Sequence, residues 1–363
     1  MRGELPLLAF GFSVVPALIL GAEGALALAE RGGRTDAESS GINYLHRYSE
    51  VYGWEPRPGR YVEAGRVITI NAQGYRGAAV GPEPAPGRRR VVLLGDSVAF
   101  GLHVDDRETY AATVSASNSG FEVLNLAVQG YGPGQSLLRL ERLGLSLNPN
   151  VVVLGFCLAN DFADAMLPTF LFNDKHPKPF FTLEQDELVR HDAHMHLGLR
   201  TRTALWLRDH SRLYRFVVAD SREPEGRREG RGGWLERRRL ATRDREATLA
   251  LVTRLVVTMR DLAASRGAPF LVLLHPDRPR LRAERWADEF AARLEAEGVS
   301  VVDLLKSYEA RGLDFEDVAT DALGHLSPPG HAATATILEA ALREASAPPQ
   351  HAAFMGTSFR PPR

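Results

Sequence analysis

One serine in the chain has the surroundings of a nucleophile. Ser97 stands in the tripeptide Gly95-Asp96-Ser97, directly after an apolar run at residues 91–94. A buried parallel strand at this run would place the serine at the strand's carboxyl end, where a helix begins and where open α/β sheets bind ligands. The free N–H groups at a helix start stabilise negative charge on an oxygen. The same tripeptide also suits an ordinary helix N-cap, so Ser97 alone does not establish catalysis.

A serine hydroxyl attacks only when a base takes its proton, and the C-terminal part of the chain offers a histidine for that role. His325 lies in the stretch TDALGHLSPPGHAA, which leads into a helix that ends near residue 345. Asp321, four residues earlier, can orient the imidazole and stabilise its charged form. His331 stands at the helix start, so we expect it to be structural. His325 and Asp321 are therefore the predicted base and acid.

Two further segments supply hydrogen-bond donors at the ends of the next two apolar runs. Gly130 lies in the glycine-rich turn NLAVQGYGPGQ, where backbone N–H groups can approach a bound oxygen closely. Asn160 brings a side-chain amide to the same edge of the predicted sheet. The N–H groups of Ser97 and Gly130 and the amide of Asn160 would together bind the negative oxygen of a tetrahedral intermediate.

Apolar runs alternating with helical patterns position these residues. Runs typical of strands buried on both faces lie at residues 91–94, 121–126, 151–157, 270–274 and 299–304. Stretches with helical spacing lie at residues 135–145, 248–266 and 283–297. Strand alternating with helix predicts a three-layer α/β/α sandwich around a parallel sheet.

The four polar elements resemble, in order, the blocks of the GDSL/SGNH hydrolases, whose name gives their Ser, Gly, Asn and His. The corresponding residues here are Ser97, Gly130, Asn160 and His325. The similarity is to bacterial members with an N-terminal apolar segment, and it extends over about residues 44–345. It implies a flavodoxin-like sandwich, ester or acyl chemistry without a metal, catalysis by Ser97 and His325, and oxyanion donors at Ser97, Gly130 and Asn160.

The chain departs from this family at the acid. The family places its acid three residues before the histidine, and that position here is Ala322. Asp321 is one residue further away, so we expect a local bulge to bring it to the imidazole. Asp317 or a backbone carbonyl would otherwise orient the ring. Asp321 is the predicted acid, with Asp317 as the alternative.

The chain divides into segments of different composition. We expect a signal peptide or anchor at residues 1–30, an irregular lead-in packed by its aromatics at 31–90, the hydrolase domain at 91–345 and a flexible tail at 346–363. Within the lead-in, residues 66–70 are predicted to form a strand. An insertion at residues 162–245 follows the third core strand, and the interleaved charges of its Arg-rich second part, about residues 222–246, predict a solvated helical face or a loop. Its place beside the site also suits a lid.

The N-terminal stretch at residues 5–22 is uncharged and close to the length of about 20 residues that spans a bilayer as a helix. Small residues at Ala25, Ala27 and Ala29 supply cleavage positions, so a signal peptide and an uncleaved anchor are both open. We therefore expect an extracytoplasmic protein, periplasmic or secreted, whose N-terminal segment lies in the membrane if it is uncleaved.

Composition excludes several classes of function. The formal net charge is −1, with 44 basic and 45 acidic side chains, so no global field attracts nucleic acid. The single cysteine, Cys157, lies in an apolar run and is expected to be buried and inert. The cluster His191, His194 and His196 lacks the spacing of a zinc helix. We expect no metal and no other cofactor.

The predicted function is hydrolysis of carboxylic esters, as an esterase or a carbohydrate O-deacylase, through an acyl-enzyme on Ser97. Two alternatives stay open. The same residues suit an O-acyltransferase that acts on an exported polysaccharide, and the displaced acid leaves room for a membrane-tethered binding module without catalysis. The acyl group, the acceptor and the oligomeric state cannot be inferred from the sequence.

Overall fold

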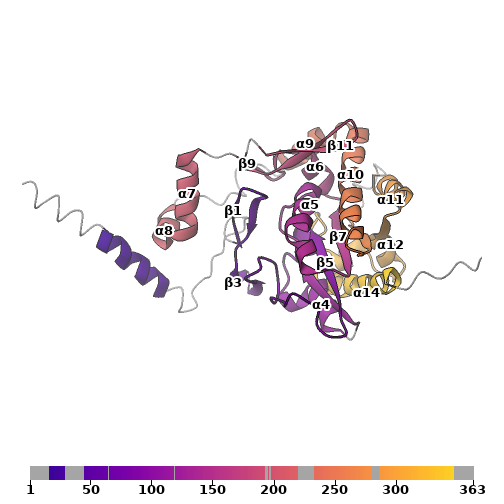
Figure 1. The fold of residues 1–363 in the computed structure, drawn as a ribbon, viewed down its shortest axis with the longest axis horizontal. Helices are drawn as coiled ribbons and strands as arrows, with labels where there is room; N and C mark the ends of the chain where they lie inside the picture. The colour runs from indigo at the N-terminus through magenta and orange to yellow at the C-terminus, as the bar shows by residue number, and fades with distance from the viewer. Residues whose placement is uncertain are drawn as a thin grey trace, which may run out of the picture.

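A five-stranded parallel sheet forms the centre of the computed structural model (Figure 1). The structure describes residues 16–28, 45–63, 65–117, 119–192, 195, 198–219, 233–278 and 286–346. The core strands are β5 (Arg89–Gly95), β6 (Phe121–Asn125), β7 (Val151–Cys157), β12 (Phe270–His275) and β13 (Ser300–Asp303). Their order across the sheet is β13-β12-β7-β5-β6, so the first core strand lies between the second and the third. This is the flavodoxin-like order, which confirms the predicted fold class.

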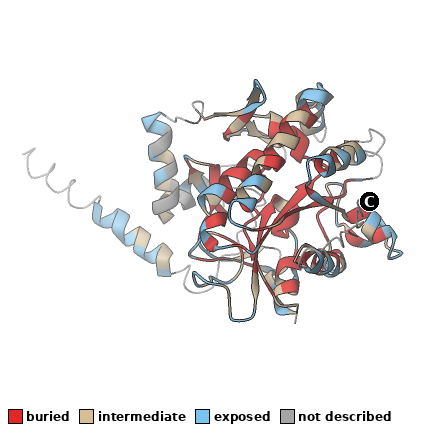
Figure 2. Ribbon diagram, turned by 45° about the vertical axis from the view of Figure 1, so that its right-hand side comes forward, coloured by how far each residue is buried: buried red, intermediate tan, exposed pale blue. Residues whose placement is uncertain are grey.

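Alternate side chains of the core strands enter two separate hydrophobic layers. Val92 and Leu94 belong to one layer, and Val91 and Leu93 belong to the other. The first layer is covered by α5 (Pro133–Arg142), α10 (Arg245–Ala264) and α11 (Trp286–Ala296). The second is covered by α3 (Ser97–Phe100), α4 (Tyr110–Ala116), α12 (Leu304–Glu309) and α14 (Pro328–Ala345). Burial is concentrated on the strands and on the helix faces toward them (Figure 2), as a parallel sheet covered on both faces requires.

Two glycines bring α3 close to the sheet. Gly95 of β5 and Gly155 of β7 are paired across the parallel ladder. A Cβ on Gly95 would lie 2.5 Å from the carbonyl oxygen of Gly155, and a Cβ on Gly155 would lie 2.9 Å from the Cβ of Ala99 in α3. Because neither glycine has a side chain, the short helix that begins with Ser97 rests directly on the strands.

The lead-in is more regular than its composition indicates. It forms two antiparallel hairpins from β1 (His46–Ser49), β2 (Gly53–Pro56), β3 (Gly59–Glu63) and β4 (Arg66–Ile70). The prediction of a strand at residues 66–70 is confirmed, whereas the prediction of irregular structure around it is wrong. The aromatic packing is present, since Tyr52 and Trp54 are buried in the main core.

The insertion contains more strand than its charges indicate. The part of the chain from 161 to 241 holds α6 (Asp161–Met166), β8 (Thr169–Phe170), β9 (Asn173–Pro177), β10 (Phe180–Glu184), β11 (Glu187–His191), α7 (Leu199–His210), α8 (Arg212–Ala219) and α9 (Gly233–Ala241). Its first part contains two antiparallel hairpins, for which the sequence carried no prediction. Its second part is helical, and residues 220–232 lie outside the described chain. The remaining elements are η1 (Asp106–Glu108), η2 (Gly144–Leu147) and α13 (Phe315–Val318).

The N-terminal apolar stretch is described only in part. Residues 16–28 form a helix, drawn in indigo in Figure 1, and Glu23 of this helix accepts hydrogen bonds from the N–H groups of Arg212 and Leu213 at the start of α8. No helix within the described residues has both the length and the hydropathy needed to cross a bilayer. The first 15 residues and the predicted tail beyond Ser346 lie outside the described chain.

Candidate active site

A serine and a histidine that are 228 residues apart in the sequence meet at the carboxyl edge of the sheet. The Oγ of Ser97 lies 2.8 Å from the Nε2 of His325. Ser97 is the first residue of α3, and Asp96 caps that helix by accepting a hydrogen bond from the N–H of Val98. Gly324 has a φ of +82° and packs against the carbonyl of Pro276, which follows β12. The loop that carries His325 therefore lies at the same edge of the sheet as Ser97.

Asp321 completes a line of three polar side chains. Its Oδ2 lies 2.6 Å from the Nδ1 of His325, while its Oδ1 accepts hydrogen bonds from the N–H groups of Leu323 at 3.0 Å and of His325 at 3.3 Å. These bonds curl the loop, so a carboxylate four residues before the histidine still reaches the ring. Burial raises the pKa of Asp321, but the hydrogen bond and charge of His325 outweigh it and leave that pKa below its usual value.

The alternative acid is occupied elsewhere. The Oδ2 of Asp317 accepts a hydrogen bond from the N–H of Asp314 at 2.8 Å, at the start of α13. Its backbone carbonyl accepts a hydrogen bond from the hydroxyl of Ser327. Of the two candidate acids, the structure therefore brings Asp321 to His325 and leaves Asp317 as part of a helix cap.

Asn160 lies next to the serine helix through Asp96. Its side chain is buried, and its Nδ2 donates a hydrogen bond to the Oδ2 of Asp96 at 3.1 Å. An amide nitrogen carries two hydrogens, so this bond leaves one for a ligand while it holds the group in place. The sequence places Asn160 at the site, but it does not reveal that Asp96 holds it. Burial raises the pKa of Asp96.

Gly130 has the backbone conformation that its predicted role requires. Its φ of +74° is left-handed, and its N–H donates to no other group among the described residues. The lead-in holds this turn from both sides, because the indole of Trp54 donates to the carbonyl of Gln129 at 3.0 Å and the hydroxyl of Tyr131 donates to the carbonyl of Trp54 at 2.7 Å. Phe170 of the insertion covers Gly130, since a Cβ there would lie 2.7 Å from its ring.

The strand order explains why Ser97 and Asn160 are neighbours. Ser97 follows β5 and Asn160 follows β7, and these adjacent strands flank the point where the direction of strand addition reverses. Connections leave the sheet toward opposite faces at such a point, which opens a crevice for ligands outside the strand ends. The predicted nucleophile and one predicted oxyanion donor lie on its two sides.

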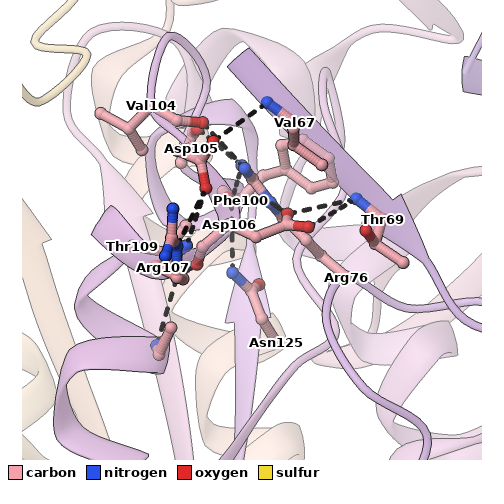
Figure 3. A network of polar contacts seen from close by, with 12 residues as sticks. Val67, Thr69, Arg76, Phe100, Val104, Asp105, Asp106, Arg107, Thr109 and Asn125 are labelled. Atoms are coloured by element: carbon pink, nitrogen blue, oxygen red, sulfur yellow. Dashed lines mark hydrogen bonds and ion pairs between the residues drawn. The ribbon is translucent and has the colours of Figure 1, made fainter. Parts of the chain in front are cut away.

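A buried arginine from the lead-in fixes the loop that follows the serine helix (Figure 3). Arg76 donates to the carbonyls of Phe100, Gly101 and Val104 at 2.7–3.0 Å and forms an ion pair of 2.9 Å with Asp106. Its guanidinium also lies over the ring of Phe100. No sequence pattern indicates this role, because the main partners of Arg76 are backbone carbonyls that come together only in the fold.

The loop held by Arg76 presents a histidine that the sequence did not single out. His103 has a φ of +74°, a conformation uncommon for residues other than glycine. Its ring meets that of His325 edge-on, with centroids 5.3 Å apart, and its Nε2 lies 3.9 Å from the Oδ2 of Asp321. Burial and the nearby His325 lower the pKa of His103. His103, Asp321 and His325 are the described residues whose arrangement could hold a metal ion.

Buried charges join the insertion to the sheet beside Asn160. The Oδ2 of Asp161 accepts a hydrogen bond from the N–H of Cys157 at 2.7 Å. Lys178, which follows β9, donates to the carbonyl of Asp164, and its Nζ lies 3.9 Å from the Oδ1 of that residue. Burial raises the pKa of Asp164 to about 6, although the charge of Lys178 opposes that shift. The first hairpin of the insertion is thus tied to the edge of the sheet that carries the site.

The other residues considered from the sequence lie away from this cluster. His191 pairs with the hydroxyl of Thr182 within the β10–β11 hairpin, and His194 and His196 lie outside the described residues. Cys157 is buried, as predicted, and burial raises the pKa of its thiol well above the usual value. His331 is buried at the start of α14, and its Nδ1 accepts a hydrogen bond from the N–H of Tyr110 at 3.2 Å.

Comparisons with known proteins find distant likenesses in structure only. No family model and no curated protein sequence matches the chain. A GDSL-like lipase from Bacteroides thetaiotaomicron is similar over 73% of this chain and 93% of its own, at 12% identity and a TM-score of 0.39. An acetylxylan esterase from Geobacillus stearothermophilus is similar over 71% and 94%, at 14% identity and a TM-score of 0.38. A member of the lipolytic protein G-D-S-L family from Veillonella parvula is similar over 70% and 97%, at 10% identity and a TM-score of 0.37. The function of this chain is therefore inferred from its own residues.

Proposed function

We propose that this chain is a serine hydrolase that cleaves carboxylic esters, with Ser97 as nucleophile, His325 as base and Asp321 as the acid that orients it. The observation that carries the proposal is the unbroken line of hydrogen bonds from Ser97 through His325 to Asp321, at 2.8 Å and 2.6 Å. A nucleophile, a base within hydrogen-bond reach of it and a third group that orients the base together form an acyl-transfer site.

Each residue has a defined task in the reaction. Ser97 Oγ attacks the ester carbonyl while the Nε2 of His325 takes its proton and then passes it to the leaving alcohol. Asp321 holds the opposite nitrogen of the ring and stabilises the imidazolium. The N–H groups of Ser97 and Gly130 and the amide of Asn160 donate to the oxygen that becomes negative. A water molecule, activated by His325, then releases the acid from Ser97.

The substrate belongs to the class of carboxylic esters, and we propose an esterase or a carbohydrate O-deacylase that works outside the cytoplasm. The apolar N-terminal stretch at residues 5–22 supports the proposal of an extracytoplasmic location. The main ground for a binding module without catalysis was the displaced acid. The short contact between Asp321 and His325 favours catalysis instead.

The proposal is tested with a fluorophosphonate probe and with p-nitrophenyl acetate on the full chain. We expect the wild type to be labelled and to turn over the ester, and Ser97→Ala to lose labelling and at least about 10³-fold in kcat with an unchanged melting temperature. Ser146→Ala removes a surface hydroxyl bonded only to its own turn and is the matched control, which should keep both activities. Undiminished turnover by a folded Ser97→Ala protein would contradict the proposal.

A further inference from the structure

The site holds one more potential ligand group than the proposed reaction uses. His103 lies at the solvent side of Asp321 and His325, and its side chain is 42% exposed. One nitrogen of each histidine and one oxygen of Asp321 lie within 4.8 Å of one another. In the proposed reaction His325 takes and returns the proton while Asp321 orients its ring, and nothing in that reaction requires a second imidazole.

The placement of His103 is built into the fold. Arg76 donates to the carbonyls of Gly101 and Val104, on either side of His103, so a buried side chain fixes the loop at both flanks. Between those anchors the backbone of His103 stays left-handed. A strained conformation persists only where its surroundings impose it, and such conformations cluster at ligand sites. The backbone that carries the imidazole is therefore held beside the pair by the fold.

We propose that His103, Asp321 and His325 bind a zinc ion that inhibits the enzyme. Two imidazole nitrogens and one carboxylate oxygen suit zinc, whereas magnesium and calcium prefer sites made of oxygen alone. Zinc holds such ligands at about 2.0 Å in a tetrahedron, which places the ligand atoms about 3.3 Å apart. The Nε2 of His103 now lies 3.9 Å from the Oδ2 of Asp321, and the Nδ1 of His325 lies 2.6 Å from it, so binding requires the ring of His103 to move closer and Asp321 to draw back from His325. A water molecule would fill the fourth position.

Zinc at this site removes the base, because it binds the nitrogen of His325 that faces Asp321. Coordination by Nδ1 replaces the hydrogen bond to Asp321, and the ring proton moves from Nδ1 to Nε2, which faces Ser97. With a proton on Nε2, the ring has no lone pair left to take the serine proton. Zinc is thus an inhibitor of the reaction and not its cofactor. The inference that zinc inhibits rests on the proposed function, whereas the inference that zinc binds does not.

The experiment measures zinc binding and ester turnover in parallel on the metal-free full chain. We expect the wild type to bind zinc by calorimetry, to lose turnover over the same concentration range and to recover it with EDTA. His103→Asn should weaken zinc binding at least about tenfold, and zinc should inhibit it correspondingly less, relative to its own metal-free rate. Asparagine is chosen because it tolerates a left-handed backbone better than most residues, and a melting curve verifies the fold.

His191→Asn is the matched control, since His191 is a partly buried histidine outside the cluster, and this variant should bind zinc and be inhibited like the wild type. Equal zinc affinity in the wild type and in His103→Asn overturns the proposal, as does a wild type that turns over ester and is indifferent to zinc. A chain that never hydrolyses ester, but binds zinc through His103, would refute the proposed function and leave the metal site standing.

Discussion

At the scale of single residues, the orientation of one imidazole decides whether Ser97 can react. His325 meets the serine with one nitrogen and Asp321 with the other, so the acid fixes both the tautomer and the direction of the base. Asp321 reaches the ring although it lies four residues before His325, because the N–H groups of Leu323 and His325 donate hydrogen bonds to its second oxygen and curl the loop.

Replacement of the acid separates the two candidates. Asp321→Asn should lower kcat for p-nitrophenyl acetate by about 10²–10⁴-fold, because an amide favours the wrong tautomer of His325. Asp317→Asn should change kcat less than about threefold, since the amide oxygen can still accept the hydrogen bond that caps α13. Steady-state kinetics on both variants, with melting curves, provide the measurement. If both variants lost kcat to a comparable extent, Asp321 would contribute by stabilising the fold rather than by orienting the ring of His325.

Residue types and spacing indicated Ser97, Gly130, Asn160 and His325, because each stands directly after a predicted strand or in a distinctive loop. For the acid, the sequence favoured Asp321 with Asp317 as the alternative, and the curl of the loop distinguishes them. His103 was missed for a physical reason. It lies 222 residues from His325 in the chain, and its nearness depends on how Arg76 shapes the loop after α3.

At the scale of elements, a buried guanidinium joins the lead-in to the serine helix. Arg76 is 4% exposed, and it satisfies three carbonyls and one carboxylate. Its removal leaves those acceptors buried without their donor, which is more costly than losing a surface contact.

Arg76→Met should therefore lower the free energy of unfolding by about 3–5 kcal/mol. Arg47→Met is the control, because Arg47 forms an ion pair with Glu55 at the surface and should contribute less than about 1 kcal/mol. Urea unfolding followed by fluorescence measures both. If Arg76→Met cost no more than Arg47→Met, the network in Figure 3 would not stabilise the loop.

The core strands were predictable, whereas the short hairpins were not. Residues 151–157 form an unbroken apolar run, and β7 has those same bounds, because a strand buried on both faces needs apolar residues throughout. Strand β9, with the sequence NDKHP, has neither such a run nor an alternation. Its conformation depends on pairing with β8 and on Lys178, which follows it and contacts Asp164, and these are contacts that no local pattern contains.

At the scale of the whole molecule, two histidines enclosed between the sheet and its helices make stability depend on pH. His275 and His331 are fully buried, each with its ring beside that of Tyr110, and burial lowers the pKa of each to about 3. In the unfolded chain they titrate near 6.5. Between pH 3 and pH 6.5 the unfolded state binds more protons than the folded state. The contribution of these histidines to the free energy of unfolding is therefore fully present above pH 6.5 and is lost as the pH falls toward 3.

His331→Gln should remove one of these two contributions. Each buried histidine adds a slope of up to about 1.4 kcal/mol per pH unit between pH 6.5 and pH 3. The free energy of unfolding of the wild type should therefore fall more steeply than that of His331→Gln as the pH is lowered from 7.5 to 4. Asp164, whose pKa of about 6 acts in the opposite direction, is present in both chains and cancels in the difference. Urea titrations at four pH values test this, and parallel curves would refute it.

The separation of 228 positions between Ser97 and His325 also bears on the biosynthesis of this protein. Translation must pass residue 325 before the proposed base exists, and α14, which follows the loop of His325, packs against α4. Ser97 should therefore be unreactive in nascent or truncated chains that lack His325. A covalent serine probe would then label only chains that extend past this residue.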